Sequence, residues 1–101
     1  MIAGLILLST LLSLSLSAAE RPSAAFGKKL FNDTHLGGSE NERSCNTCHI
    51  GGNGMQNAAA RSDIAAVINF CIAGPLKGKK IADNSVEMQS LTLYIRSLKG
   101  K

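Results

Sequence analysis

The spacing of apolar residues along the chain predicts three short helices. In residues 24–32 apolar side chains recur at helical spacing among strong helix formers, at Phe26, Leu30 and Phe31. A second helix is expected to open at Ser62-Asp63 and to end at Gly74-Pro75, with an apolar face made of Ile64, Val67, Ile68 and Cys71. A third is expected from Asn84 or Ser85 to about Leu98, with an apolar stripe made of Met88, Leu91, Tyr94 or Ile95, and Leu98.

The segments between these helices are rich in turn-forming residues. Residues 33–44 combine glycines with charged side chains, residues 50–61 are rich in Gly and Asn, and the connection after Pro75 is basic. No stretch alternates apolar and polar residues at period two, so no strand is predicted. The sequence therefore predicts an all-α fold of three to four short helices.

The first 19 residues have the composition of a secretion signal. They contain no charged residue, run apolar from Ile2 to Leu16, and close with Ser17-Ala18-Ala19, small residues of the kind that a signal peptidase reads. The apolar run is shorter than the ~20 residues that a membrane-spanning helix needs. We therefore predict cleavage after Ala19, a single domain over residues 20–101, a periplasmic or secreted location, and no membrane span after cleavage.

A domain this short buries little apolar surface and needs additional stabilisation, for example from disulfides or a bound metal. The chain has three cysteines, so a framework of disulfides alone leaves one thiol over. Two of them form the motif Cys45-Asn46-Thr47-Cys48-His49. In an exported chain, CxxCH is the signature of covalent haem c attachment, with two thioethers to the porphyrin and the histidine as proximal iron ligand.

Other chemistries fit the same motif less well. A thioredoxin-like redox pair needs a βαβ unit around it, which the pattern of apolar residues does not show. A zinc site needs a second pair of ligands, and the sequence offers only Cys71 and His35 for it. One haem c is therefore the predicted cofactor, and its macrocycle supplies the apolar body around which the short chain packs.

The chain resembles the small monohaem cytochromes c in its segments GKKLF, CNTCH and LTLYIRSL. In that family the N- and C-terminal helices cross, which implies a crossing of Gly27 and Phe31 with Leu91 and Tyr94. The run from Gly27 to His49 also resembles the haem region of bacterial dihaem peroxidases. Because the sequence holds a single CxxCH, we expect an electron carrier and not an enzyme.

The distal iron ligand is open between two candidates. Met88 lies far enough beyond His49 to round the haem edge, and its thioether would raise the reduction potential. Cys71 is the alternative, because the segment NFCIAGPLKGKKIADNSVEM resembles Cys-ligated sulfur-oxidising cytochromes, and thiolate ligation would lower the potential. Met55 is expected at the haem edge, and His35 in an exposed loop.

The charge balance bears on partners. The chain carries 11 Lys+Arg against 7 Asp+Glu, a formal net charge of +4. A cluster made of Lys77, Lys79 and Lys80 predicts docking of an acidic redox protein near the haem edge. No basic face is interleaved with aromatic residues, so nucleic acid is not an expected partner. Expected functions are electron transfer or, as alternatives, periplasmic sulfur-compound oxidation with Cys71 on the iron, or gas binding.

Overall fold

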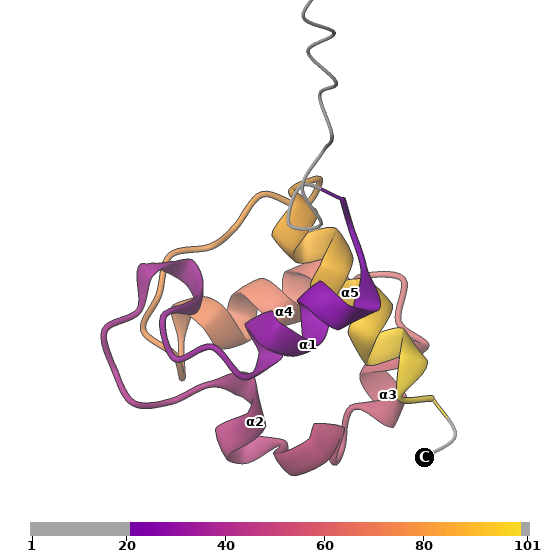
Figure 1. Ribbon diagram of the computed structural model, residues 1–101, viewed down its shortest axis with the longest axis horizontal. Helices are drawn as coiled ribbons and strands as arrows, with labels where there is room; N and C mark the ends of the chain where they lie inside the picture. The colour runs from indigo at the N-terminus through magenta and orange to yellow at the C-terminus, as the bar shows by residue number, and fades with distance from the viewer. Residues whose placement is uncertain (1–20, 100–101) are drawn as a thin grey trace, which may run out of the picture.

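The structure is a computed structural model that describes residues 21–99; the predicted leader, residues 1–19, lies outside this range. Five α-helices and two single 3₁₀ turns follow one another in the described chain: α1 (Ala24–Phe31), η2 (Leu36–Gly38), α2 (Cys45–Cys48), η3 (Ile50–Gly52), α3 (Gln56–Ala59), α4 (Ile64–Ala73) and α5 (Val86–Ser97) (Figure 1). The described residues contain no strand, which confirms the all-α prediction. None of their helices has the length and apolar character to cross a membrane.

The three predicted helices form where the sequence places their signals. α1 begins after Ser23, whose hydroxyl accepts a hydrogen bond from the Phe26 amide at 3.0 Å. α5 begins after Ser85, whose hydroxyl accepts from the Met88 amide at 3.1 Å. Each side chain satisfies one of the amides that a helix leaves unpaired in its first turn. α4 ends at Gly74, as predicted from Gly74-Pro75.

Two predicted loops contain helical turns, and the first of them, residues 33–44, holds η2. Residues 50–61 hold η3 and the short helix α3. The glycines still break the chain there, because Gly51, Gly52 and Gly54 adopt φ angles of +62°, +84° and +85°, a region that residues with a Cβ rarely enter. Past the last of them, Gln56–Ala59 consists of residues compatible with a helix, and α3 forms.

α1 crosses α5 with their backbones in contact, as the resemblance to cytochromes c implies. A Cβ at Gly27 would collide with the Ser90 carbonyl and come within 2.8 Å of the Tyr94 Cβ, so only glycine allows this approach. Next to it, the Phe31 and Tyr94 rings meet edge to face with centroids 5.2 Å apart. The Ser23 amide donates to the Ser90 hydroxyl at 3.1 Å, which ties the start of α1 to the middle of α5.

The core lies between this crossing and α4. Its most buried large side chains come from three helices, namely Phe31 from α1, Ile72 from α4, and Met88 and Leu91 from α5. α2 and α3 lie at one end of the crossed pair, with α4 beside it (Figure 1). This arrangement leaves an apolar hollow between the segment that holds CxxCH and the core helices.

Candidate functional site

The CxxC segment forms a single capped helical turn. Ser44 is the N-cap of α2, and its backbone amide donates to the Thr47 hydroxyl at 2.9 Å in a capping box. Because residues three apart lie on the same face of a helix, α2 presents Cys45 and Cys48 to the same side. Cys45 is half-buried and Cys48 is exposed at the rim. Two thiols so placed have the spacing that thioether bonds to one porphyrin require.

His49 follows α2 directly, and its ring is oriented by a hydrogen bond. Its Nδ1 lies 2.9 Å from the Asn53 carbonyl oxygen. A carbonyl only accepts, so Nδ1 donates and the lone pair of Nε2 is left for a metal. Gly54 lies against the same ring, since a Cβ there would stand 3.5 Å from Nδ1. Such a backbone partner is the usual outer support of a metal-binding histidine.

The two cysteines and His49 lie on the wall of one cavity. Among its other lining residues only Ser44 and Cys71 are not wholly apolar, and the rest are Phe31, Met55, Ala58, Ile64, Val67, Ile68, Pro75, Leu76, Leu91 and Ile95. All five α-helices contribute lining residues, together with the connection after α4. The cavity therefore combines two thiols and an imidazole with an apolar wall.

Burial raises the pKa of two thiols of this cavity, Cys45 and Cys71. The pKa of Cys45 is raised to about 11, first by burial and then by the negative charge that Cys71 would carry nearby. The pKa of Cys71 is also raised, again mainly by burial and then by Cys48. All three cysteines line the same cavity.

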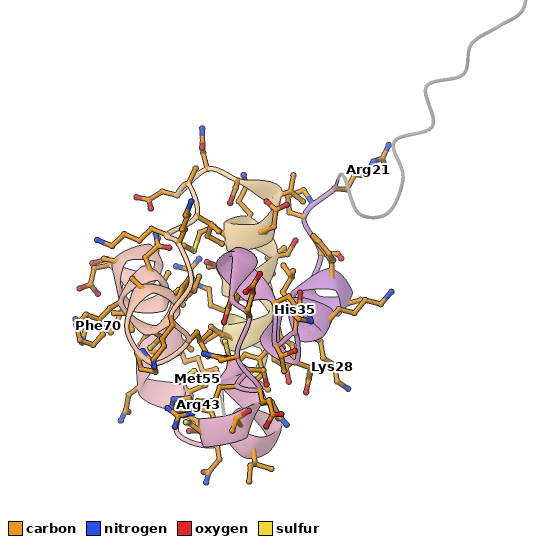
Figure 2. The ribbon with its side chains drawn as sticks, turned by 90° about the vertical axis from the view of Figure 1, so that its left-hand side faces the viewer. Arg21, Lys28, His35, Arg43, Met55 and Phe70 are labelled. Carbon is orange, nitrogen blue, oxygen red and sulfur yellow. The ribbon has the colours of Figure 1, made fainter. Side chains whose placement is uncertain are left out.

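The predicted distal candidates have different positions in the structure. Cys71 and Met55 both line the cavity. Met88 does not: it belongs to the core, and its side chain is 1% exposed. His35 lies on the surface loop after α1, where its Nδ1 is 3.0 Å from the Ser39 carbonyl oxygen, and it does not line the cavity (Figure 2).

These residues fit a covalently bound haem. The donor set consists of two thiols and an imidazole with a free Nε2, and the remaining wall is apolar, as a porphyrin body requires. Among the described residues, no cluster of three or more His, Cys, Asp or Glu side chains is arranged to hold a bare metal ion. Cys45, Cys48 and His49 would hold the haem.

A comparison with family profiles found a match. The profile of the di-haem cytochrome c peroxidase family matches residues 21–97. The chain belongs to this family. Searches of curated proteins and of solved structures found no match. Of the resemblances seen in the sequence, the comparison supports the one to dihaem peroxidases.

Membership of the di-haem cytochrome c peroxidase family makes the chain a haem-binding redox protein with haem c as its cofactor. The described fold agrees with this, because it is all-helical around the CxxCH segment. The family name refers to two haems, whereas the 101 residues contain a single CxxCH.

The part of the cavity wall formed by residues 75 and 76 was not predicted from the sequence. Pro75 and Leu76 lie in the connection after α4, which was predicted only as a basic, glycine-containing link. Leu76 is 4% exposed, although it stands alone among glycines and lysines. The apolar side chain of Leu76 in an otherwise polar connection could have indicated burial, because an exposed connection gains nothing from an apolar residue.

Proposed function

We propose that this member of the di-haem cytochrome c peroxidase family is an exported monohaem electron carrier. The observation that supports it best is the joint position of Cys45, Cys48 and His49 on one apolar cavity. The single CxxCH supports one haem, and the apolar leader composition of residues 1–19 supports export.

In this proposal each residue has a defined task. A haem bound in the cavity would supply one-electron redox chemistry at its iron. Cys45 and Cys48 would hold the porphyrin through thioethers, and His49 would offer Nε2 to the iron while the Asn53 carbonyl orients its ring. The apolar side chains from α4 and α5 would exclude water from the cavity around a bound haem, which would lower the reorganisation that accompanies a change of charge.

Mass spectrometry and redox titration of the full chain, expressed with a cytochrome c maturation system, test this proposal. We expect the mass of one haem on the wild type, and loss of its covalent attachment in the Cys45→Ser, Cys48→Ser double variant. Cys71→Ser is the matched control, because it removes the third thiol and leaves CxxCH intact. A wild type without covalent haem, or one that turns over hydrogen peroxide with an added electron donor, contradicts the proposal.

A second candidate function rests on Cys71. This thiol lines the cavity whereas Met88 is packed in the core, and that difference supports Cys71 as the distal ligand over Met88. A Cys-ligated haem would have a low potential and would suit sulfur-compound oxidation, the alternative function. Gas binding would instead require that no protein side chain takes the distal position.

Spectra of the ferric and of the reduced protein separate these three alternatives for the distal ligand. Methionine ligation gives a near-infrared charge-transfer band that disappears in Met88→Leu. Thiolate ligation lacks this band and gives a low-spin signal in electron paramagnetic resonance that changes in Cys71→Ala but not in Met88→Leu. A reduced wild-type haem that is five-coordinate and takes up carbon monoxide freely favours gas binding.

The partner of this carrier is proposed to be an acidic redox protein. Two hydrogen bonds between the Asn69 side chain and the Ile81 backbone, at 2.8 and 2.9 Å, hold the end of the basic connection beside α4. Lys79 and Lys80 immediately precede Ile81, and Phe70, which is 74% exposed, immediately follows Asn69. The two lysines therefore lie near an exposed apolar side chain, and this combination is common in transient docking surfaces.

Oxidation of the ferrous protein by the anion ferricyanide tests the charge component of this surface. We expect the Lys79→Gln, Lys80→Gln variant to react more slowly than the wild type, with a difference that shrinks as salt is added. The Lys28→Gln, Lys29→Gln variant is the matched control: it removes the same charge from exposed positions on α1, and Lys28 lies on the opposite side of the molecule from Phe70 (Figure 2). Equal rates in the two variants contradict the proposed site.

A further inference from the structure

Two loops that are distant in the sequence are joined beside the cavity. The loop between α1 and α2 lies along the connection between α4 and α5 (Figure 1). The Lys79 amide donates to the Gly37 carbonyl at 2.8 Å, which joins the two loops. The Gly78 amide donates to the Ile72 carbonyl at 2.7 Å, which holds the connection against the end of α4. A Cβ at Gly78 would come within 2.8 Å of the Leu36 carbonyl oxygen, so the two backbones are in contact.

The Leu76 carbonyl is the point where this junction meets the cavity. It accepts two side-chain hydrogen bonds, one from the Ser39 hydroxyl and one from the Asn41 amide nitrogen, the second at 2.6 Å. Ser39 is 2% exposed, so its hydrogen bond to Leu76 is shielded from water, whereas the one from Asn41 is partly buried. Pro75 and Leu76 line the cavity, and both hydrogen bonds therefore act directly on its wall.

Asn41 extends this link to the haem-attachment segment. While its Nδ2 donates to Leu76, its Oδ1 accepts from the backbone amide of Arg43 at 2.8 Å. Arg43 immediately precedes Ser44, the N-cap of α2, and lies two positions before Cys45. One planar amide thus joins the cavity wall after α4 to the chain that enters CxxCH.

We propose that Asn41 is a positioning residue that sets the distance between the CxxCH segment and the opposite wall formed by residues 75 and 76, and that Ser39 supports it at the same carbonyl. The link would control how readily an added ligand enters the cavity beside a haem held by Cys45, Cys48 and His49. When Asn41 loses its hydrogen bond to Leu76, the wall moves more freely relative to α2, and an added ligand reaches the iron more readily. The inference rests on the proposed haem function.

Binding of imidazole to the ferric, haem-loaded chain, followed by its visible spectrum, tests this proposal. Asn41→Ala removes both the hydrogen bond to the Leu76 carbonyl and the one from the Arg43 amide. Asn41→Asp is nearly isosteric and keeps the acceptor for the Arg43 amide, but it cannot donate to the Leu76 carbonyl at neutral pH. In both variants we expect imidazole to bind about five to ten times faster than in the wild type, the factor that corresponds to one lost hydrogen bond.

Asn32→Ala is the matched control, because Asn32 is exposed and its amide donates to the Lys28 carbonyl at 2.8 Å, away from the cavity. It should leave the imidazole rate unchanged. Equal rates in wild type and Asn41→Asp overturn the proposal, even if thermal unfolding shows that Asn41→Ala is less stable, because a merely structural role lowers stability without changing access. A wild type that carries no covalent haem overturns the proposed function as well, whereas haem attachment with equal rates overturns only the role of Asn41.

Discussion

Replacing Gly27 with alanine tests the helix crossing that shapes the cavity. In an exposed helix this change is favourable, because alanine forms helix more readily than glycine by about 1 kcal/mol. At Gly27 the new methyl group would collide with the Ser90 carbonyl and approach the Tyr94 Cβ to 2.8 Å. The carbonyl belongs to the backbone of α5 and cannot rotate away, so the two helices must separate.

The expected cost follows from these contacts. Overpacking of a fitted core costs about 1–3 kcal/mol, and the upper end applies where backbone meets backbone. Separation also weakens the hydrogen bond from the Ser23 amide to the Ser90 hydroxyl and the ring contact between Phe31 and Tyr94. After subtraction of the gain in helix propensity, we expect a loss of about 2 kcal/mol, or about 10 °C in melting temperature for a domain of this size.

Thermal unfolding of the haem-loaded chain, followed by far-ultraviolet circular dichroism, measures this loss. Ala25→Gly is the control: Ala25 is exposed on the same helix, so the substitution reports the propensity difference alone, about 1 kcal/mol of destabilisation. If Gly27→Ala instead stabilises the protein by the amount that Ala25→Gly destabilises it, the crossing has room for a methyl group and the reasoning is refuted.

Two further substitutions test other contacts. Asn69→Ala removes two hydrogen bonds to the Ile81 backbone from a residue that is 7% exposed, so urea unfolding should show a loss of about 1–3 kcal/mol; an unchanged midpoint contradicts it. Arg61 lowers the pKa of Asp63 through a paired hydrogen bond at 2.7 and 2.8 Å. Arg61→Gln should therefore raise the pKa of Asp63 in a nuclear magnetic resonance titration. Because the pKa of Asp63 is lowered in the folded state, the stabilisation from this pair is present above the ordinary pKa of aspartate and is lost as the pH falls through the lowered value.

The helices were predictable because their signals are local. The cap at Ser85, one of the two positions predicted, and the break at Gly74 depend on neighbours within one turn, so they could be predicted from the sequence. The thiols and imidazole of CxxCH are likewise close in sequence. The role of Asn41 could not be predicted, because its partner Leu76 lies 35 positions away and an asparagine in a charged loop carries no periodic signal.

The contrast between Met88 and Cys71 follows from how each helix is packed. Met88 lies in the first turn of α5 and fills the core with a side chain that is 1% exposed. To reach an iron in the cavity it would have to leave that position, and an emptied site of this size costs about 2–5 kcal/mol. Cys71 needs no such rearrangement, since α4 already places it on the cavity wall. Repacking therefore opposes ligation by Met88, and the raised pKa of Cys71 opposes formation of its thiolate, so the Met88→Leu and Cys71→Ala spectra are the most direct measure of the site.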